Sequence, residues 1–298
     1  MLSIVIPTYN RAAPLRLCIE SVLQQQAGDV ELIVVDDGSS DGTADILEEL
    51  KQQHVNIRIV KNAGNFGVNY SRNRGIERAS QPFIVFLDSD DQLRSGSLNR
   101  IKNTIRENPG ARHFLFWVSD REEECGNLKQ ARPVQYKEWV KGTIKGDYIH
   151  VVAADVMKRF LFFERFRMYE YLNWLRVFKD TSPQILVNFV VANRERNRPD
   201  CLTNAAKLHD LSLIKNKFDS QHLYYTLYHE DLRYFQSNAL SKKLLAVIVL
   251  GVACNRRKAC YRLLKYGNRM YIKLAGSVIL LIPAAMARWF ITTWSAIK

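Results

Sequence analysis

One stretch, FIVFLDSDD at residues 83–91, carries the strongest structural signal in the chain. Its five leading apolar residues have no helical spacing, which predicts a strand buried on both faces of a parallel sheet. The strand runs into Asp88, Asp90 and Asp91, and such carboxylates are costly beside a core because they repel one another and lose hydration. A divalent cation such as Mg²⁺ or Mn²⁺ would offset that cost. The alternative is a solvated acidic turn that leads into a helix.

The segments on either side of this stretch alternate between strand and helix patterns. Before it, apolar runs and helical spacing predict strands at 2–7, 32–35 and 57–60, with helices around 15–23, up to Glu49, and from Phe66 to Ala79. After it, they predict helices at 98–108, 156–163 and 168–179, strands at 113–118 and 185–191, and a polar loop region at 121–146. This alternation implies an α/β fold: a Rossmann-like, mostly parallel sheet with right-handed crossovers and helices on both faces.

Composition and charge describe a globular chain with two unlike halves. Of its 298 residues 47% are apolar and 24% charged, which excludes a disordered protein. The net charge is −2 over residues 1–110 and +15 over the remainder, and no acidic residue follows Asp231. The second part therefore favours an anionic partner. Five scattered cysteines without ligand spacing, and a strand at the very start, predict free thiols, no signal peptide and a cytoplasmic location.

Four motifs occur in order along the first hundred residues: IVIPTYN at 4–10, VVDDGS at 34–39, NFG and SRNRG between 65 and 75, and FLDSDD at 86–91. Together they resemble the family 2 glycosyltransferases of GT-A fold, which transfer a sugar from a nucleotide-sugar with inversion. The resemblance is strong over about the first hundred residues and loose over 160–205. It implies a GT-A domain at 1–205, with a nucleotide-binding half at 1–120 and an acceptor half at 121–205. Residues 206–298 would form a separate helical region.

The resemblance places Pro7, Tyr9, Asp36 and Asp37 in the nucleotide site. Asp37, at the carboxyl end of a strand, can accept a hydrogen bond from N3–H of a uracil, and Tyr9 can stack on the base. The alternative for the aspartate pair is an Asx-turn, and Pro7 can simply end a strand.

Further contacts are expected from one arginine and the acidic cluster. Arg72, on the helix before the cluster, can meet a phosphate or pair with Asp88. In relatives, the positions that match Asp90 and Asp91 touch the ribose and a metal that bridges the two phosphates. Asp90 is thus expected in the nucleotide and metal sites and Asp91 in the metal site. Which of the two ligates the Mn²⁺ or Mg²⁺ directly stays open.

An inverting transfer also needs a general base for the acceptor hydroxyl. Family members carry a Glu-Asp pair before a Trp-Leu-Arg helix, with the Asp as base. In RMYEYLNWLR at 167–176, Glu170 takes the base position and a tyrosine replaces the preceding acid, which departs from the pattern. The alternative is that Glu170 pairs with Arg167 or Arg176 on the helix surface. Glu164 is the next candidate for the base.

Arg198 is a candidate diphosphate contact. The segment RNRPDCLT at 196–203 resembles the family's Arg-x-His-x-x-Ser-x-Ser/Thr segment, whose histidine lies near the diphosphate. Arg198 stands in the histidine slot, where it could bind phosphate but could not ligate a metal. A basic surface loop is the alternative.

The tail contains two apolar runs, 244–253 and 274–287, each flanked by lysines and arginines. Both are shorter than the roughly 20 residues that a spanning helix needs, and the second contains Pro283. They predict interfacial or re-entrant helices on an anionic membrane, which would make the protein peripheral or monotopic on the cytoplasmic face. The alternative is a second helical core with solvated charges.

The sequence thus predicts an inverting, metal-dependent glycosyltransferase. Its donor would be a nucleotide-sugar, with UDP favoured by Asp37, and its acceptor a glycan hydroxyl, polyprenyl-diphosphate-linked, in cell-surface polysaccharide synthesis. Nucleic acid is not an expected partner. One alternative is a polyprenyl-phosphate sugar synthase, and another is a non-catalytic membrane-binding module that kept the fold. A nicotinamide-dependent enzyme is disfavoured because no G-x-G-x-x-G follows the first strand.

Overall fold

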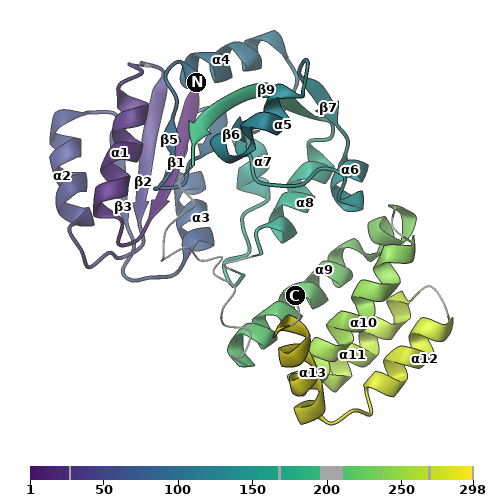
Figure 1. The fold of residues 1–298 in the computed structure, drawn as a ribbon. Coiled ribbons are helices and arrows are strands. Elements are labelled where there is room, and N and C mark those ends of the chain that lie inside the picture. The colour runs from purple at the N-terminus through teal and green to yellow at the C-terminus, as the bar shows by residue number, and fades with distance from the viewer. Residues whose placement is uncertain (27, 167–168, 195–210, 236, 268–269, 297–298) are drawn as a thin grey trace. The chain divides into compact units, whose positions relative to one another are not determined.

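A computed structural model describes residues 1–26, 28–166, 169–194, 211–235, 237–267 and 270–296 (Figure 1). The chain divides into two compact units. The first comprises Met1–Trp139 and Ile144–Arg196, and the second comprises Val140–Thr143 and Asn197–Lys298. The predicted domain boundary at residue 205 lies outside the described residues.

The first unit is built on one sheet of nine described strands. These are β1 (Leu2–Thr8), β2 (Val30–Asp36), β3 (Ile57–Lys61), β4 (Phe83–Phe86), β5 (Gln92–Leu93), β6 (His113–Val118), β7 (Arg132–Val134), β8 (Ile149–Ala153) and β9 (Gln184–Asn193). Their order is β3-β2-β1-β4-β8-β6-β9-β5, and β7 pairs with β9. The first four strands in that order run parallel, whereas β8 is antiparallel to both of its neighbours.

Helices cover both faces of this sheet (Figure 1). The described helices of the unit are α1 (Ala12–Leu23), α2 (Thr43–Gln53), α3 (Val68–Arg78), α4 (Ser97–Glu107), η1 (Ser119–Arg121), α5 (Glu122–Gly126), α6 (Tyr136–Lys141), α7 (Ala154–Arg159) and α8 (Tyr171–Asp180). Ile4 and Ile6 pack into a core with α1, α2 and α4, whereas Val5 joins a second core with α3, α7 and α8. Alternate residues of a strand point to opposite faces, so a strand covered twice needs an unbroken apolar run. The predicted α/β fold is confirmed.

The structure differs from the prediction beyond residue 120. The region 121–146, expected as a polar loop, contains α5, β7 and α6. The strand β8, which was not predicted, runs antiparallel between β4 and β6. The helix expected from residue 168 begins at Tyr171. These elements are short, and β7 is held by hydrogen bonds to the distant strand β9, so a local pattern cannot identify them.

The second unit is helical. Its described helices are α9 (Leu211–Phe235), α10 (Ser237–Ala253), α11 (Arg257–Leu263), η2 (Leu264–Tyr266), α12 (Met270–Ile279) and α13 (Ala284–Ala296). Helix α10 packs against α9, α11, α12 and α13. The predicted apolar run 274–287 is interrupted between α12 and α13, where Pro283 prevents a continuous helix. Arg257 donates hydrogen bonds to the carbonyls of Leu280 (3.0 Å) and Ile282 (2.6 Å) and so supports that turn.

The apolar helices of this unit are short. Over the described parts of the chain, each helix taken singly lacks the length and apolarity of a membrane span. Residues Ile272–Ile279 and Ala284–Ile291 meet the criterion only as a pair, bent by 110°.

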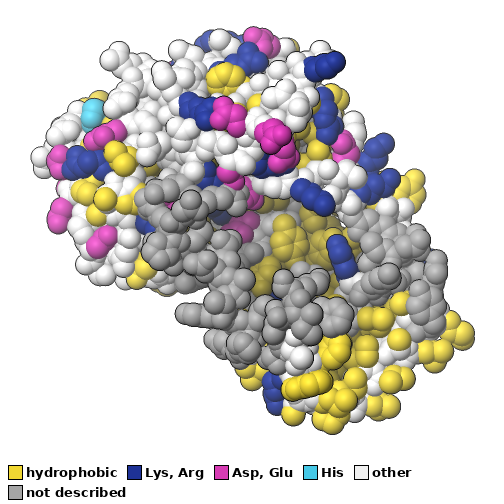
Figure 2. All heavy atoms as spheres, viewed as in Figure 1, with side chains coloured by type: hydrophobic (Ala, Val, Ile, Leu, Met, Phe, Trp, Pro, Cys, Tyr) yellow, Lys and Arg dark blue, Asp and Glu magenta, His cyan; other side chains and the backbone are white. Residues whose placement is uncertain are grey.

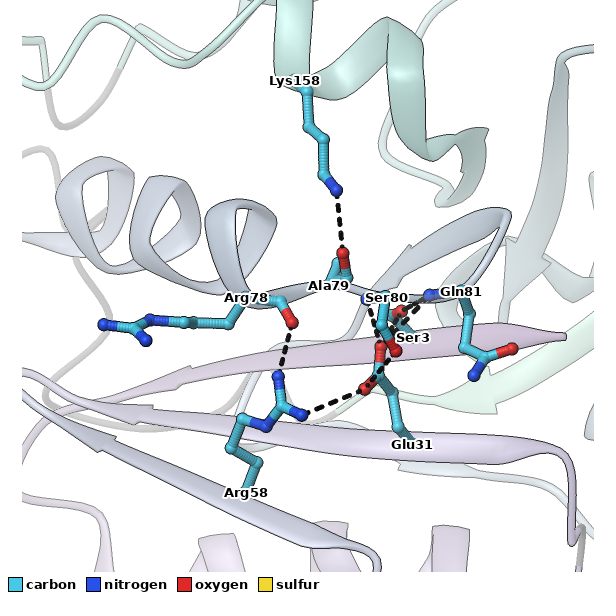
Figure 3. A network of polar contacts seen from close by, with 8 residues as sticks. All are labelled: Ser3, Glu31, Arg58, Arg78, Ala79, Ser80, Gln81 and Lys158. Atoms are coloured by element: carbon cyan, nitrogen blue, oxygen red, sulfur yellow. Dashed lines mark hydrogen bonds and ion pairs between the residues drawn. The ribbon is translucent and has the colours of Figure 1, made fainter.

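A half-buried carboxylate links the strands at the end of the sheet where β1 and β2 begin (Figure 3). Glu31, at the start of β2, accepts hydrogen bonds from the backbone and hydroxyl of Ser80 (2.6 and 3.0 Å) and from the hydroxyl of Ser3 on β1. Burial acts to raise the pKa of Glu31, but hydrogen bonds from Ser3, Ser80 and Gln81 outweigh it and hold this pKa below its ordinary value. Arg58 and Lys158 donate to the carbonyls of Arg78 and Ala79, at the end of α3.

Replacement of Glu31 by glutamine should lower the free energy of unfolding by about 1–3 kcal/mol at pH 7, because the amide cannot accept all of these hydrogen bonds. A carboxylate whose pKa is lowered by folding stabilises the protein above its unfolded pKa of about 4.3. The difference from wild type should therefore shrink as the pH falls below that value. Urea unfolding at pH 7 and pH 3.5 measures it, with the exposed Glu48→Gln on α2 as control.

At the other end of the sheet, the loop after β2 lies against the loop after β3. Gly38 has a φ of +76°, and a Cβ at this position would lie 2.7 Å from Cα of Gly64. Glycine is required here for two reasons: the left-handed backbone and the close approach of the two loops. This contact brings the end of β2 next to the loop that leads into α3.

Gly38→Ala should therefore destabilise the protein more than Gly96→Ala does. Gly96 has almost the same φ, +78°, but a Cβ there would meet nothing within 4 Å. The control should cost only the left-handed penalty of about 1–2 kcal/mol. The Gly38 variant should cost at least twice as much, because the backbone at Gly64 must also move. Equal losses in the two variants, measured by urea unfolding, would show that the close approach does not matter.

Candidate functional site

The carboxyl ends of β1, β2 and β4 face one edge of the sheet, and the polar residues predicted from the sequence follow these ends. The loops after β1 and β2 are cross-linked: the Asn10 backbone N–H donates to the Ser39 hydroxyl (2.9 Å), and the Ser40 N–H donates to the Asn10 side chain (2.8 Å). Pro7 is buried within β1, and Tyr9 is 42% exposed just beyond it. The Tyr9 ring is thus accessible at the sheet edge, where a base would stack.

Asp37 is buried and holds the loop that follows β3. Its Oδ1 accepts hydrogen bonds from Asn62 Nδ2 (2.9 Å) and the Phe66 N–H (3.1 Å), and its Oδ2 accepts one from the Gly67 N–H (2.6 Å). A carboxylate has about four acceptor positions, so these three bonds leave one for a further donor. The predicted contact with the nucleobase stays a prediction.

Asp36 forms the turn that was the alternative interpretation of the aspartate pair. Its Oδ1 accepts a hydrogen bond from the Ser39 N–H at 3.0 Å. Its Oδ2 is buried and has no hydrogen-bond partner among the described residues. The Thr8 hydroxyl, on the neighbouring strand β1, is likewise buried and has no hydrogen-bond partner among the described residues. The Asp36 side chain therefore stabilises the turn with one oxygen, while its other oxygen can still accept a hydrogen bond.

Helix α3 positions the segment that leads to Glu170. Asn69 donates to the carbonyls of Phe163 (3.1 Å) and Phe166 (2.8 Å). One turn later, Asn73 donates to the Phe162 carbonyl (3.0 Å) and accepts from the Phe162 N–H (2.8 Å). Residues four apart lie on the same face of a helix, so the side chains of Asn69 and Asn73 both bind the same stretch of chain. The approach to α8 is thereby fixed on α3.

Arg72 lies between these two asparagines and joins the acidic strand end to the predicted base. Its Nη2 donates to Asp88 Oδ1 at 2.9 Å, and its Nη1 lies 3.6 Å from Glu170 Oε1. The pairing with Asp88, one of the two alternatives for Arg72, is therefore present, and a phosphate contact stays a prediction. The guanidinium is mostly buried, which makes both ion pairs stronger than pairs on an open surface.

Glu170 lies at the N-terminal end of α8 with 28% of its side chain exposed. Burial raises the pKa of Glu170, the charge of Arg72 opposes this rise, and Asp88 and Asp147 add to it. An accessible carboxylate with a raised pKa is suited to accept a proton. The alternative was that Glu170 pairs with Arg167 or Arg176. Arg167 lies outside the described residues, and Arg176 donates hydrogen bonds to the Asn173 side chain and to the Leu161 carbonyl.

The acidic cluster ends in a buried carboxylate. Asp91 is nearly inaccessible, and burial together with Asp88 and Asp90 raises the pKa of Asp91 to about 7, against the opposing charge of Arg194. Arg194 Nε lies 3.4 Å from Asp91 Oδ2, and its Nη1 lies 3.2 Å from Asp147 Oδ2. A second arginine, like Arg72, thus offsets carboxylates on this edge of the sheet.

The donor set of this cluster fits a divalent cation. Over the part of the chain described here, no three or more His, Cys, Asp or Glu side chains are arranged to hold a metal ion. Mg²⁺ and Mn²⁺ at phosphates, however, need only one or two carboxylates, since substrate oxygens and water complete the octahedron. Asp90 and Asp91 can supply these carboxylates, and a bound cation would favour the ionised form of Asp91.

Several residues near the site were not identified from the sequence. Arg194 follows β9, Asp147 precedes β8, and His113 and His150 come from β6 and β8. Each is brought to the site by strand pairing over tens of residues, so no local pattern could reveal it. Arg198, the candidate diphosphate contact, lies outside the described residues.

Comparison with known proteins identifies a family for this chain. Residues 3–165 match the family described as "Glycosyl transferase family 2". Among curated proteins, the chain is 30% identical over 189 residues to the GalNAc(5)-diNAcBac-PP-undecaprenol beta-1,3-glucosyltransferase of Campylobacter jejuni, covering 61% of this chain and 60% of that protein. It is 36% identical over 149 residues to the putative teichuronic acid biosynthesis glycosyltransferase TuaG of Bacillus subtilis, covering 49% and 59%.

Solved structures agree with the fold. Residues 1–349 of S. aureus TarS in complex with UDP-GlcNAc superpose with a TM-score of 0.66 at 14% identity, covering all of this chain and 92% of that one. A mannosyltransferase of Pyrobaculum calidifontis in complex with GDP-Man and Mn²⁺ has a TM-score of 0.57 at 14% identity, with coverage of 99% and 79%. The matches span less than two thirds of the length of these two curated relatives. The family match covers more than half of this chain, and the resemblance of its motifs is confirmed: the chain belongs to glycosyl transferase family 2.

Proposed function

We propose that this protein is an inverting glycosyltransferase that moves a sugar from a nucleotide-sugar to a hydroxyl of a glycan acceptor in cell-surface polysaccharide synthesis. The observation that carries the proposal is the bridge made by Arg72 between Asp88 and Glu170. It sets a raised-pKa carboxylate beside the strand end where family members bind the donor. The C. jejuni and B. subtilis relatives named above support the polysaccharide context.

In this mechanism Glu170 is the general base. The acceptor oxygen bonds to C1 of the donor sugar while its proton passes to Glu170, and the C1–oxygen bond to the diphosphate breaks with its electrons on the leaving group. Attack opposite the leaving group inverts the anomeric carbon. Arg72 keeps Glu170 in place and favours its ionised form.

Asp90 and Asp91 would hold a Mn²⁺ or Mg²⁺ ion, which when bound supplies positive charge for the departing diphosphate. The Mn²⁺ complex of the P. calidifontis mannosyltransferase supports this choice of ion. Tyr9 and Asp37 would contact the base, and the UDP-GlcNAc complex of TarS favours uridine as the nucleoside.

Glu170→Gln should lower kcat by roughly 10²–10⁴-fold, because the isosteric amide cannot accept the proton. Nucleotide release from UDP-, GDP- and TDP-sugars with Mn²⁺ and acceptor measures this effect, and Asp91→Asn should also lose activity. In wild type, kcat should fall as the pH drops through the raised pKa of Glu170, and the part of this fall that is due to Glu170 should be absent from Glu170→Gln.

Glu164→Gln is the matched control, because Glu164 is exposed and accepts a hydrogen bond from Asn73 at 2.9 Å. Its activity should stay near that of wild type; a larger loss in this variant than in Glu170→Gln would move the base to Glu164. Full activity of Glu170→Gln with a polyprenyl phosphate acceptor would favour the alternative, a polyprenyl-phosphate sugar synthase, whose acceptor is already ionised. Absence of nucleotide binding in calorimetry would favour a non-catalytic membrane-binding module.

The second unit would bring this enzyme to an anionic membrane on its cytoplasmic face, where a polyprenyl-diphosphate-linked acceptor is accessible. Large hydrophobic side chains are exposed on α12, on α13 and at the bend between them: Met270, Leu274, Val278, Leu281, Met286, Trp289 and Phe290. Figure 2 shows hydrophobic side chains gathered over these C-terminal helices. Residues 197–298 carry 16 lysines and arginines against 5 acidic residues, and this net charge of +11 would add attraction to anionic lipid.

The double variant Leu274→Glu, Leu281→Glu should bind vesicles of phosphatidylcholine and phosphatidylglycerol at least tenfold more weakly, since burial of one leucine contributes about 1.5–3 kcal/mol. Vesicle co-sedimentation measures the partition. The control carries Leu17→Glu and Val55→Glu, two exposed apolar positions of the first unit, and should bind like wild type. Equal binding by both double variants would place the membrane contact elsewhere.

A further inference from the structure

Two histidines that have no part in the proposed mechanism form a hydrogen-bonded chain under the site. His113 Nε2 lies 2.9 Å from His150 Nδ1, and His113 Nδ1 lies 3.2 Å from the Thr181 hydroxyl. His113 is completely buried on β6, and His150 is half-buried on β8. The chain therefore leads from the end of α8, through the core, to the accessible side of His150.

The position of every proton in this chain follows from Thr181. Its hydroxyl lies 2.8 Å from the Val177 carbonyl and accepts a hydrogen bond from Gln184 Nε2 at 3.1 Å. A carbonyl cannot donate, so we assign the single hydroxyl proton to the contact with the Val177 carbonyl, which is shorter than the 3.2 Å contact with His113; His113 Nδ1 then carries a hydrogen that it donates to Thr181. His113 Nε2 is then an acceptor, and His150 Nδ1 donates to it. This assignment leaves a lone pair on His150 Nε2.

Both rings are neutral. Burial lowers the pKa of His113 well below its ordinary value, and His150 adds to this effect. Burial, followed by the charges of Arg72 and Arg194, lowers the pKa of His150 to about 3. A neutral ring with its proton fixed on Nδ1 is a permanent acceptor at Nε2 over the range in which the enzyme would work.

The surroundings of His150 connect it with the residues of the candidate site. Its ring stacks on Trp174, with 3.9 Å between ring centroids and 13° between planes, and Trp174 lies one helical turn after Glu170. The charges of Arg72, which binds Glu170, and of Arg194, which binds Asp91, both reach the ring. His150 Nε2 has no hydrogen-bond partner in the described part of the chain, although it is not among the buried unpaired atoms. It is therefore at least partly accessible, on a ring reached by the charges of the two arginines that pair with Glu170 and Asp91.

We propose that His150 Nε2 accepts a hydrogen bond from a sugar hydroxyl in the site and so helps to select and orient that sugar. This inference rests on the proposed function. The hydroxyl could belong to the donor sugar or to the acceptor glycan, and both sources present the same donor group. His113 and Thr181 act as positioning residues, because they hold the proton on the other nitrogen of His150.

Two substitutions separate the nitrogen that would touch the sugar from the nitrogen that touches His113. Asparagine places an amide near Nδ1, so His150→Asn keeps the hydrogen bond to His113 and removes the outer acceptor. Glutamine reaches the position of Nε2, so His150→Gln keeps an acceptor there. His150→Asn should lower kcat/KM roughly tenfold, the effect of one neutral hydrogen bond, and His150→Gln should recover most of that loss. The control His222→Asn, on α9, should change nothing.

Calorimetry shows whether the hydroxyl that His150 binds belongs to the sugar of the nucleotide-sugar or to the acceptor glycan. If the hydroxyl belongs to the donor sugar, His150→Asn weakens binding of the nucleotide-sugar but not of the nucleotide alone. If the hydroxyl belongs to the acceptor glycan, the affinities for nucleotide-sugar and for nucleotide stay unchanged and KM for the acceptor rises. Unchanged values for donor and acceptor alike in His150→Asn would overturn the inference, with thermal unfolding used to confirm that the variant is folded.

Nitrogen-15 NMR of the histidine rings tests the same inference without turnover. His150 Nε2 should have the resonance of an unprotonated ring nitrogen, and this resonance should move toward the protonated range when nucleotide-sugar or acceptor is added. A proton on Nε2 in the free protein would overturn the inference. Absence of nucleotide release by wild type from every donor would contradict the proposed function, whereas the NMR response to sugar would still decide the role of His150.

Discussion

The hydrogen bonds that Asp37 accepts at the start of α3 are the constraint on which the rest of the site depends. They determine where the helix begins, because the N–H groups of Phe66 and Gly67 point at one buried carboxylate. The face of α3 then carries Asn69 and Asn73, which hold the segment that leads to α8. Helix α3, whose start is held by Asp37, thus determines where the segment before the predicted base lies relative to the edge of the sheet.

The balance of charge at this edge of the sheet is a second constraint on the site. Five carboxylates, those of Asp88, Asp90, Asp91, Asp147 and Glu170, are opposed by the guanidinium groups of Arg72 and Arg194. The arginines pair with individual carboxylates, but burial, together with the neighbouring carboxylates, still raises the pKa values of Asp91 and Glu170. A cluster of carboxylates of this kind suits a cation at one end and a proton acceptor at the other.

The second unit has a different physical character. Its core is built around α10, while α12 and α13 expose large apolar side chains at a bend that Pro283 enforces. Arg257 holds the carbonyls at this bend, so the exposed apolar surface has a defined shape. Such a patch among basic residues is unusual for a surface in contact only with water and is typical of an interaction site.

The sequence by itself determined the first four parallel strands, the family, and the acidic positions at the strand ends, because each is written in a short local pattern. Unbroken apolar runs such as 83–87 indicate strands covered on both faces, and the carboxylates that follow indicate a site. The Asp88 pairing of Arg72 was foreseen as one of two alternatives. Glu170 was selected by its spacing from Trp174, and the structure places it beside Arg72.

Only the tertiary structure decided the rest. The pairing of Asp91 with Arg194 joins residues 103 positions apart, and the contact of His113 with His150 joins residues 37 apart. Strands β7 and β8 form because neighbouring strands supply their hydrogen bonds. The proton arrangement that leaves a lone pair on His150 depends on Thr181, at the end of another helix. Interactions of this kind exist only after the chain has folded, since distant segments provide both partners, and no local sequence pattern records them.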